Sequence, residues 1–178
     1  SFALAYERFG EPSEVLQKVP IQPENLMKKN QVLVKYIASP INPADINTIQ
    51  GVYPLEPASF PAIGGNEGVA EVIRVGPSVK DIKVGDKVIP APAATGTWTT
   101  HRVLTEKDFI VLNKDVDPLF AAQITVNPCT AYRMLQDFVK LQEGANCCRF
   151  TFDSIFDFKF LFTGDSVIQN GGNSAVGI

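Results

Sequence analysis

Tyr53 follows a short segment with strong helix signals, and its side chain could transfer a proton. A neutral phenol, with a pKa of about 10, can hydrogen-bond a developing oxyanion or supply a proton, which a carboxylate cannot do at neutral pH. The alternative is that a tyrosine next to Pro54 at a helix exit only packs, with its hydroxyl in water. Tyr53 is therefore the candidate catalytic residue, with a packing role left open.

The polar residues near Tyr53 have structural explanations. We expect Asp45 to cap the helix and Asn47 and Glu67 to make turn hydrogen bonds. The only histidine is His101, expected on a strand or surface without acid-base work, and no cysteine precedes Cys129. A four-coordinate zinc site of cysteine and histidine therefore cannot be assembled in this part of the chain, and we predict no metal.

The last ten residues have the character of a phosphate-binding turn. An apolar strand enters a turn rich in Gly, Asn and Ser over residues 169–178, where a helix would follow. Backbone N–H groups and a helix dipole converge on an anion at such a turn, which holds the phosphates of a dinucleotide. We expect the chain to carry only the beginning of a cofactor domain.

The first two thirds of the chain read as short strands separated by Gly and Pro. Apolar runs occur at residues 32–37, 68–76, 86–90 and 109–112, and their spacing favours a small barrel or sandwich. One helix is predicted over residues 42–51, because Asn42 can cap it, Pro43 suits its first position and Gly51 can end it. This helix should position the residues that follow it, Tyr53 included.

Helical spacing appears from residue 117 onward, at residues 118–122 and 128–138, and predicts a linker into a second domain. We divide the chain into residues 1–125 and 126–178. Within the second part, residues 145–163 hold six of the twelve phenylalanines. This block is interpreted as an atypical insertion, either translated non-coding sequence or an ordinary buried strand.

Charge and cysteine content exclude several classes of function. With 16 Lys and Arg against 19 Asp and Glu, the net charge of -3 argues against a nucleic-acid partner. No apolar run reaches the roughly 18 residues of a membrane span, so no membrane partner is expected. Three cysteines do not make a disulfide framework, which favours a reducing compartment.

Two glycine-containing motifs carry a family resemblance. Residues 64–68, Gly-Gly-Asn-Glu-Gly, and residues 85–88, Gly-Asp-Lys-Val, resemble the catalytic domain of the medium-chain dehydrogenase/reductase superfamily. Its zinc alcohol dehydrogenases have a histidine ligand at the place of Asn66 and a cysteine ligand in the region of Ala44 and Asp45. Within the superfamily, residues 42–54, 96–98 and 127–134 resemble the mitochondrial trans-2-enoyl thioester reductases.

The resemblance implies a fold class of α+β, with a GroES-like β-barrel catalytic domain followed by the first elements of a truncated Rossmann domain. It also implies NADPH-dependent reduction of enoyl thioesters carried on CoA or acyl carrier protein, a mitochondrial location and a homodimer. Tyr53 falls on the family's catalytic tyrosine. The cofactor-binding positions are Asn127, Asn173, Ser174, Ala175 and Val176.

Two other functions remain open: a quinone reductase of the same superfamily, and a non-catalytic truncated isoform. We expect residues 1–178 alone to bind no NADPH and reduce no enoyl thioester, because most of the dinucleotide site would be missing. Trp98 has two interpretations. It could line an acyl pocket, or it could be an ordinary core residue. Cys129 is expected to be a small buried thiol.

Overall fold

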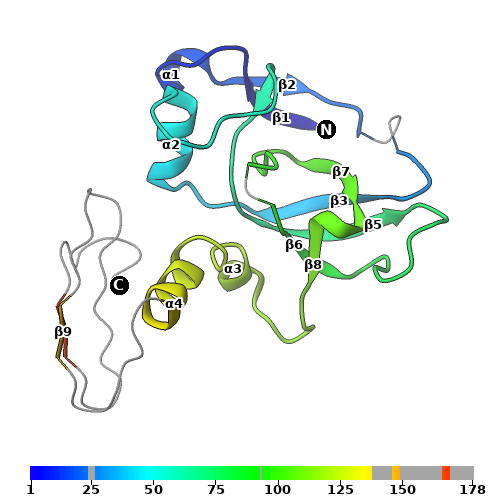
Figure 1. Ribbon diagram of the computed structural model, residues 1–178. Helices are drawn as coiled ribbons and strands as arrows, with labels where there is room; N and C mark the ends of the chain where they lie inside the picture. Colours follow the sequence, from blue (N-terminus) through cyan, green and yellow to red (C-terminus); the bar gives the residue numbers. More distant parts are fainter. Residues whose placement is uncertain (24–26, 93, 138–145, 149–165, 169–178) are drawn as a thin grey trace. The chain divides into compact units, whose positions relative to one another are not determined.

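The computed structural model describes residues 1–23, 27–92, 94–137, 146–148 and 166–168 (Figure 1). The chain divides into two compact units, Ser1–Gln123 and Ile124–Ile178. In the described residues, no helix is both long and apolar enough to cross a membrane. The division at residues 125 and 126 into catalytic and cofactor domains stays a prediction.

A five-stranded antiparallel sheet forms the larger part of the first unit. Its strand order is β7 (His101–Thr105), β3 (Gln31–Ala38), β5 (Val69–Val75), β6 (Lys87–Pro90) and β8 (Phe109–Val111). Alternate side chains of β3 and β5 meet on one face, with Val34 opposite Val72 in the ladder. That face builds the main core from residues Val32, Val34, Ala70, Val72, Ile82, Val88 and Phe109.

A three-stranded antiparallel sheet has the order β2 (Gln17–Pro20), β1 (Phe2–Tyr6) and β4 (Ala62–Ile63). Residues 97–100 connect it to the larger sheet, because Leu4 N–H donates to the Trp98 carbonyl at 2.9 Å and Tyr36 N–H to the Thr100 carbonyl at 3.0 Å. In the described part of the chain, the expected barrel is thus two sheets joined through this segment, not one closed ladder (Figure 1).

The first unit also contains short helical segments. They are α1 (Pro12–Val15), α2 (Pro43–Gln50), a 3-10 turn at Glu106–Asp108, and α3 (Pro118–Ala121). Helices α1 and α2 contribute Val15 and Ile49 to a second core cluster with Tyr6 and Ala62. This cluster packs α2 against the smaller sheet, so α2 is a rigid support for the residues at both of its ends.

The second unit contains α4 (Asn127–Asp137) and two short strands, β9 (Asn146–Cys148) and β10 (Ser166–Ile168). The helix agrees with the one predicted over residues 128–138. The two strands pair in parallel, with Val167 opposite Cys147. This pairing involves three residues of the block at 145–163, and the interpretation of the block as an insertion stays a prediction. The remainder of the block, residues 149–163, lies outside the described residues.

Candidate active site

The start of α2 is held by side chains rather than by local backbone alone. Pro43 occupies the first turn as predicted, and the Asp45 carboxylate accepts a hydrogen bond from the Asn42 N–H at 2.7 Å. Asn42 and Asp45 form a capping box at the helix start, as the predicted capping role of Asn42 requires. The Asn42 Nδ2 also donates to Glu67 Oε1 at 2.8 Å, so the helix start is tied to a residue 25 positions away.

Asp45 makes a second bond that sequence reasoning missed. Its Oδ1 accepts from the Asn66 N–H at 2.9 Å, which joins α2 to the turn at residues 64–68. The side chain is 2% exposed. Burial raises the pKa of Asp45 above its ordinary value and the charge of Glu67 adds to the rise, while the hydrogen bonds from Asn42 and Asn66 oppose it.

Glu67, which was expected to make turn hydrogen bonds, is buried and bonds across to the start of α2. Besides the bond from Asn42, its backbone carbonyl accepts from Thr97 Oγ1 at 2.7 Å. A buried carboxylate needs such partners, because removing its hydration without compensation is costly. We call Asn42, Asp45, Asn66, Glu67 and Thr97 the polar network.

The two glycines of the turn are required by the close approach of Trp98. A Cβ atom on Gly64 would lie 2.5 Å from Trp98 Cε3, and one on Gly65 would lie 2.3 Å from Thr97 Oγ1. Gly65 also has a φ of 94°, in the left-handed region that favours glycine. The turn and the Thr97–Trp98 segment are further joined by a bond from Trp98 N–H to the Gly64 carbonyl at 2.9 Å.

Trp98 contacts a core cluster and also lines a groove. It packs against the second core cluster, and it lines an apolar groove of about 460 Å³. Its Nε1 donates to the Pro40 carbonyl at 3.1 Å, which fixes the orientation of the indole. Burial raises the pKa of Tyr36, another wall of the groove, to about 12. The groove is lined by Phe2, Leu4, Leu16, Tyr36, Ile37, Ala38, Ser39, Ile41, Ile46, Thr97, Trp98, Thr99 and Thr100.

Tyr53 lies on a loop that leaves the C-terminal end of α2. Gly51, with a φ of 77°, ends the helix as predicted, and Val52 N–H donates to the Asn47 carbonyl at 3.0 Å. The Phe9 ring lies against Gly51 and also contacts Phe60 edge to face, with ring centroids 5.1 Å apart. Both ends of the loop are therefore anchored at Phe9. Tyr53 itself is half-buried.

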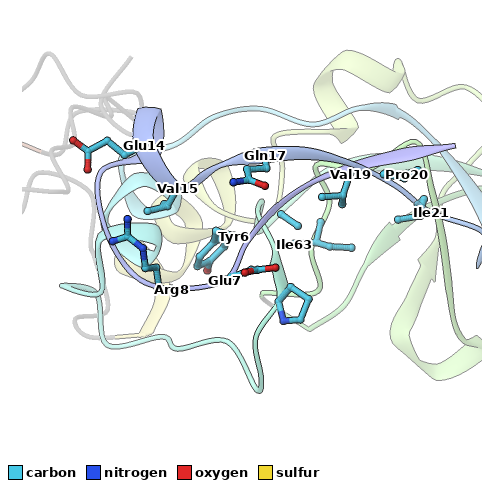
Figure 2. Close-up of a pocket in the computed structure, with 12 residues that line it drawn as sticks. Tyr6, Glu7, Arg8, Glu14, Val15, Gln17, Val19, Pro20, Ile21 and Ile63 are labelled. Atoms are coloured by element: carbon cyan, nitrogen blue, oxygen red, sulfur yellow. The ribbon is translucent and has the colours of Figure 1, made fainter.

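Tyr6 stands between two cavities. A small one of about 20 Å³ lies beside Asp45, Thr48, Asn66 and Pro57. A larger one of about 490 Å³ has Arg8 and Glu14 at one end and Val19, Pro20 and Ile21 at the other (Figure 2). Burial raises the pKa of Tyr6, and its ring meets Phe60 edge to face at 5.7 Å. Tyr6 thus contacts the end of the loop that carries Tyr53.

The predicted cofactor residues are only partly described. Asn127 is the first residue of α4 and is half-buried, whereas Asn173, Ser174, Ala175 and Val176 lie outside the described residues. Cys129 is exposed, so the expectation of a buried thiol is wrong. The Nδ1 atom of His101, on β7, is 2.9 Å from the Ser1 hydroxyl. Within the described ranges no three His, Cys, Asp or Glu residues are grouped so as to hold a metal.

This chain is similar to known proteins in both sequence and fold. Residues 28–112 match the family described as alcohol dehydrogenase GroES-like domain. The mitochondrial enoyl-[acyl-carrier-protein] reductase of Caenorhabditis elegans is 44% identical over 174 residues, which are 98% of this chain and 44% of the relative. A solved complex of Etr1p with NADP and crotonyl-CoA is 40% identical with a TM-score of 0.74, over 83% of this chain and 46% of that one.

Two further solved structures bear on partners and on the alternative function. The mitochondrial 2-enoyl thioester reductase Etr1p/Etr2p heterodimer from Candida tropicalis is 40% identical, with a TM-score of 0.78, over 99% of this chain and 49% of that one. Escherichia coli quinone oxidoreductase complexed with NADPH is 28% identical, with a TM-score of 0.70, over 83% of this chain and 44% of that one. Both the sequence identity and the TM-score are higher for the thioester reductase than for the quinone oxidoreductase.

The joined antiparallel sheets and the Gly-Gly turn beside α2 define a GroES-like catalytic domain of the medium-chain dehydrogenase/reductase superfamily, which confirms the expected fold class. Within that superfamily, nearly the whole chain is similar to part of the mitochondrial enoyl thioester reductases. The chain spans less than half the length of these relatives.

Proposed function

We propose that the protein containing this chain reduces the double bond of trans-2-enoyl thioesters with NADPH. The observation that carries the proposal is the position of Tyr53 on a loop anchored by α2, Phe9 and Phe60, in a chain related to enoyl thioester reductases. Where zinc relatives would place a metal, this chain has hydrogen-bonded Asp45 and Asn66. An organic proton donor, not a metal, would then serve the carbonyl oxygen.

The chemistry matches a tyrosine donor. Bound NADPH would be the hydride source for the β-carbon of the enoyl group, and hydride addition there would place negative charge on the thioester oxygen and the α-carbon. The Tyr53 hydroxyl would hydrogen-bond that oxygen or protonate the resulting enolate. For the cofactor we propose Asn127 and, at the phosphate-binding turn, Asn173, Ser174, Ala175 and Val176. The acyl role of the Trp98 groove stays a prediction.

The names of the relatives support the remaining assignments. The acyl carrier would be CoA or acyl carrier protein, because one solved relative holds crotonyl-CoA and another relative is named for acyl carrier protein. The relatives are named mitochondrial, and one solved relative is a heterodimer of two similar chains. We therefore propose a mitochondrial location and a dimer, with two identical subunits as the specific form.

Steady-state kinetics on the full-length protein would test the proposal. NADPH oxidation is measured with crotonyl-CoA and, separately, with a small quinone. Saturable turnover of the thioester with little quinone reduction is expected. The opposite preference would favour the quinone reductase alternative, which rests on the similarity to the Escherichia coli enzyme. No turnover of either substrate, with the protein folded, would favour a non-catalytic function.

A further inference from the structure

Asp45 is a buried carboxylate that touches two separate segments of the site. Its Oδ2 accepts from the N–H of Asn42, at the start of α2, and its Oδ1 accepts from the N–H of Asn66, in the turn at residues 64–68. Each oxygen therefore holds one backbone segment. Hydrogen bonds to an ionised carboxylate are short and about twice as strong as neutral ones, so this bridge is a strong constraint.

Other members of the polar network reinforce the same connection. Glu67 follows Asn66 directly and accepts from the Asn42 side chain at 2.8 Å, so the turn is tied to the helix start a second time. Thr97 Oγ1 then ties the Glu67 carbonyl to the segment that carries Trp98 at 2.7 Å. Three segments distant in sequence are thereby held in one arrangement around Asp45.

The helix transmits this arrangement to its other end. Helix α2 has eight residues, packs through Ile49 into the second core cluster and ends at Gly51, two residues before Tyr53. A rotation of the helix start relative to the turn would shift the Tyr53 loop. A small cavity of about 20 Å³ lies between the turn and this loop, lined by Asp45, Asn66 and Pro57.

We propose that Asp45 is a positioning residue: by bridging Asn42 and Asn66 it sets where Tyr53 stands relative to the turn at residues 64–68. This inference rests on the proposed function, in which Tyr53 acts on the thioester oxygen. Asp45 itself need not touch the substrate. Misplacing a reacting group by about 1 Å can cost about 10²-fold in rate, so the effect should appear in kcat.

Three variants of the full-length protein test the inference. Asp45→Asn keeps one acceptor oxygen, so it can serve the N–H of Asn42 or of Asn66 but not both. Asp45→Ala removes both acceptors. The matched control is Asp115→Asn, the same chemical change at an exposed carboxylate of the same unit. Amide hydrogen exchange is followed at Asn42 and Asn66, together with kcat and KM for crotonyl-CoA and NADPH.

We expect exchange at Asn42 and Asn66 to accelerate about tenfold or more in Asp45→Ala, and at one of the two in Asp45→Asn, while core amides of β3 and β5 keep their protection. The kcat should fall about 10- to 10²-fold with an unchanged KM for NADPH. Asp115→Asn should match wild type in both measurements. A general loss of structure would accelerate exchange at the core amides as well, so it can be distinguished from the local loss of the Asp45 bridge.

Two results would overturn the inference. One is unchanged exchange at Asn42 and Asn66, which would mean that Asp45 does not hold these segments. The other is accelerated exchange with near wild-type kcat, which would mean that the bridge does not position Tyr53. If the wild-type protein does not reduce crotonyl-CoA at all, the proposed function fails, and the exchange data still decide whether Asp45 joins the two segments.

Discussion

The two ends of α2 are held in different ways. At the N-terminal end, Asp45 and Asn42 bond to Asn66 and Glu67, 21 and 25 residues further along the chain. At the C-terminal end, Gly51 and Val52 donate to carbonyls of the helix itself, in the pattern of a Schellman motif, and the Ile49 carbonyl accepts from the Gly10 N–H at 3.0 Å. The N-terminal end is therefore joined to the turn by buried side chains, whereas the C-terminal end is closed by backbone hydrogen bonds and leads into the loop that carries Tyr53.

The two ends of α2 also differ in burial and in the kind of contact that holds them. The polar network at the first end is buried and hydrogen-bonded, which suits a rigid scaffold. The loop at the second end is half-exposed at Tyr53 and is anchored mainly by aromatic contacts at Phe9 and Phe60. Reacting groups commonly lie on loops that a rigid scaffold positions.

The largest effect is expected at Tyr53. Tyr53→Phe keeps the ring and removes the donor, and loss of one positioned acid typically costs about 10²–10⁴-fold in rate. The measurement is kcat of the full-length protein with crotonyl-CoA and NADPH. Tyr132→Phe, the same change at an exposed tyrosine on α4, is the control. Near-normal turnover in Tyr53→Phe would leave Tyr53 with a packing role only.

The second largest effect is expected at Gly65, in the turn at residues 64–68 that the polar network holds. Gly65→Ala would place a Cβ against Thr97 and Trp98 at a left-handed φ, so we expect a loss of about 2–4 kcal/mol in the free energy of unfolding. Gly85→Ala is the control, because Gly85 has a φ of 90° but nothing within 4 Å. It should lose only about 1–2 kcal/mol. Equal losses in urea denaturation would show that the close approach to Trp98 does not matter.

A smaller effect is expected at the other end of α2. Gly51→Ala would strain a φ of 77° and place a Cβ 2.7 Å from Phe9 Cγ, near the base of that side chain. We expect a loss of about 2–3 kcal/mol in the free energy of unfolding, more than that of Gly85→Ala because of this contact. Thermal or urea denaturation measures it. A loss as large as that of Gly65→Ala would mean that the C-terminal end of α2 is as tightly constrained as the turn that holds its N-terminal end.

The smallest effect concerns the pH dependence of stability. Because burial raises the pKa of Asp45, the folded state binds its proton more readily than the unfolded state. The contribution of Asp45 to the free energy of unfolding should therefore fall as the pH rises from the ordinary carboxyl range through the raised value, and stay level above it. Urea denaturation of wild type and Asp45→Asn over this range gives the difference.

Glu67 is the other carboxylate that acts on Asp45, so Glu67→Gln serves as the companion variant. It removes the charge of Glu67 and keeps an acceptor for Asn42. It should reduce the pH dependence of the free energy of unfolding without abolishing it. A difference between wild type and Asp45→Asn that does not change with pH would show that Asp45 is not perturbed in the folded state.

The sequence by itself determined the local elements. Pro43 and Gly51 set the bounds of α2 because their backbone preferences act within a few residues, and the apolar runs predicted β3, β5, β6 and β8 for the same reason. The motif at residues 64–68 indicated the superfamily. The residue types alone also showed that no histidine stands at the place of Asn66 and no cysteine in the region of Ala44 and Asp45.

Only the tertiary structure decided how these elements meet. Glu67 was expected to make turn hydrogen bonds, but its carboxylate accepts from Asn42, 25 positions away. Gly64 and Gly65 are explained by the close approach of Trp98, more than 30 positions away. Asp45 was recognised as a cap, but its bond to Asn66 had no local signal. Such contacts depend on the packing of α2, the turn and residues 97–100 around one core, which no short-range preference encodes.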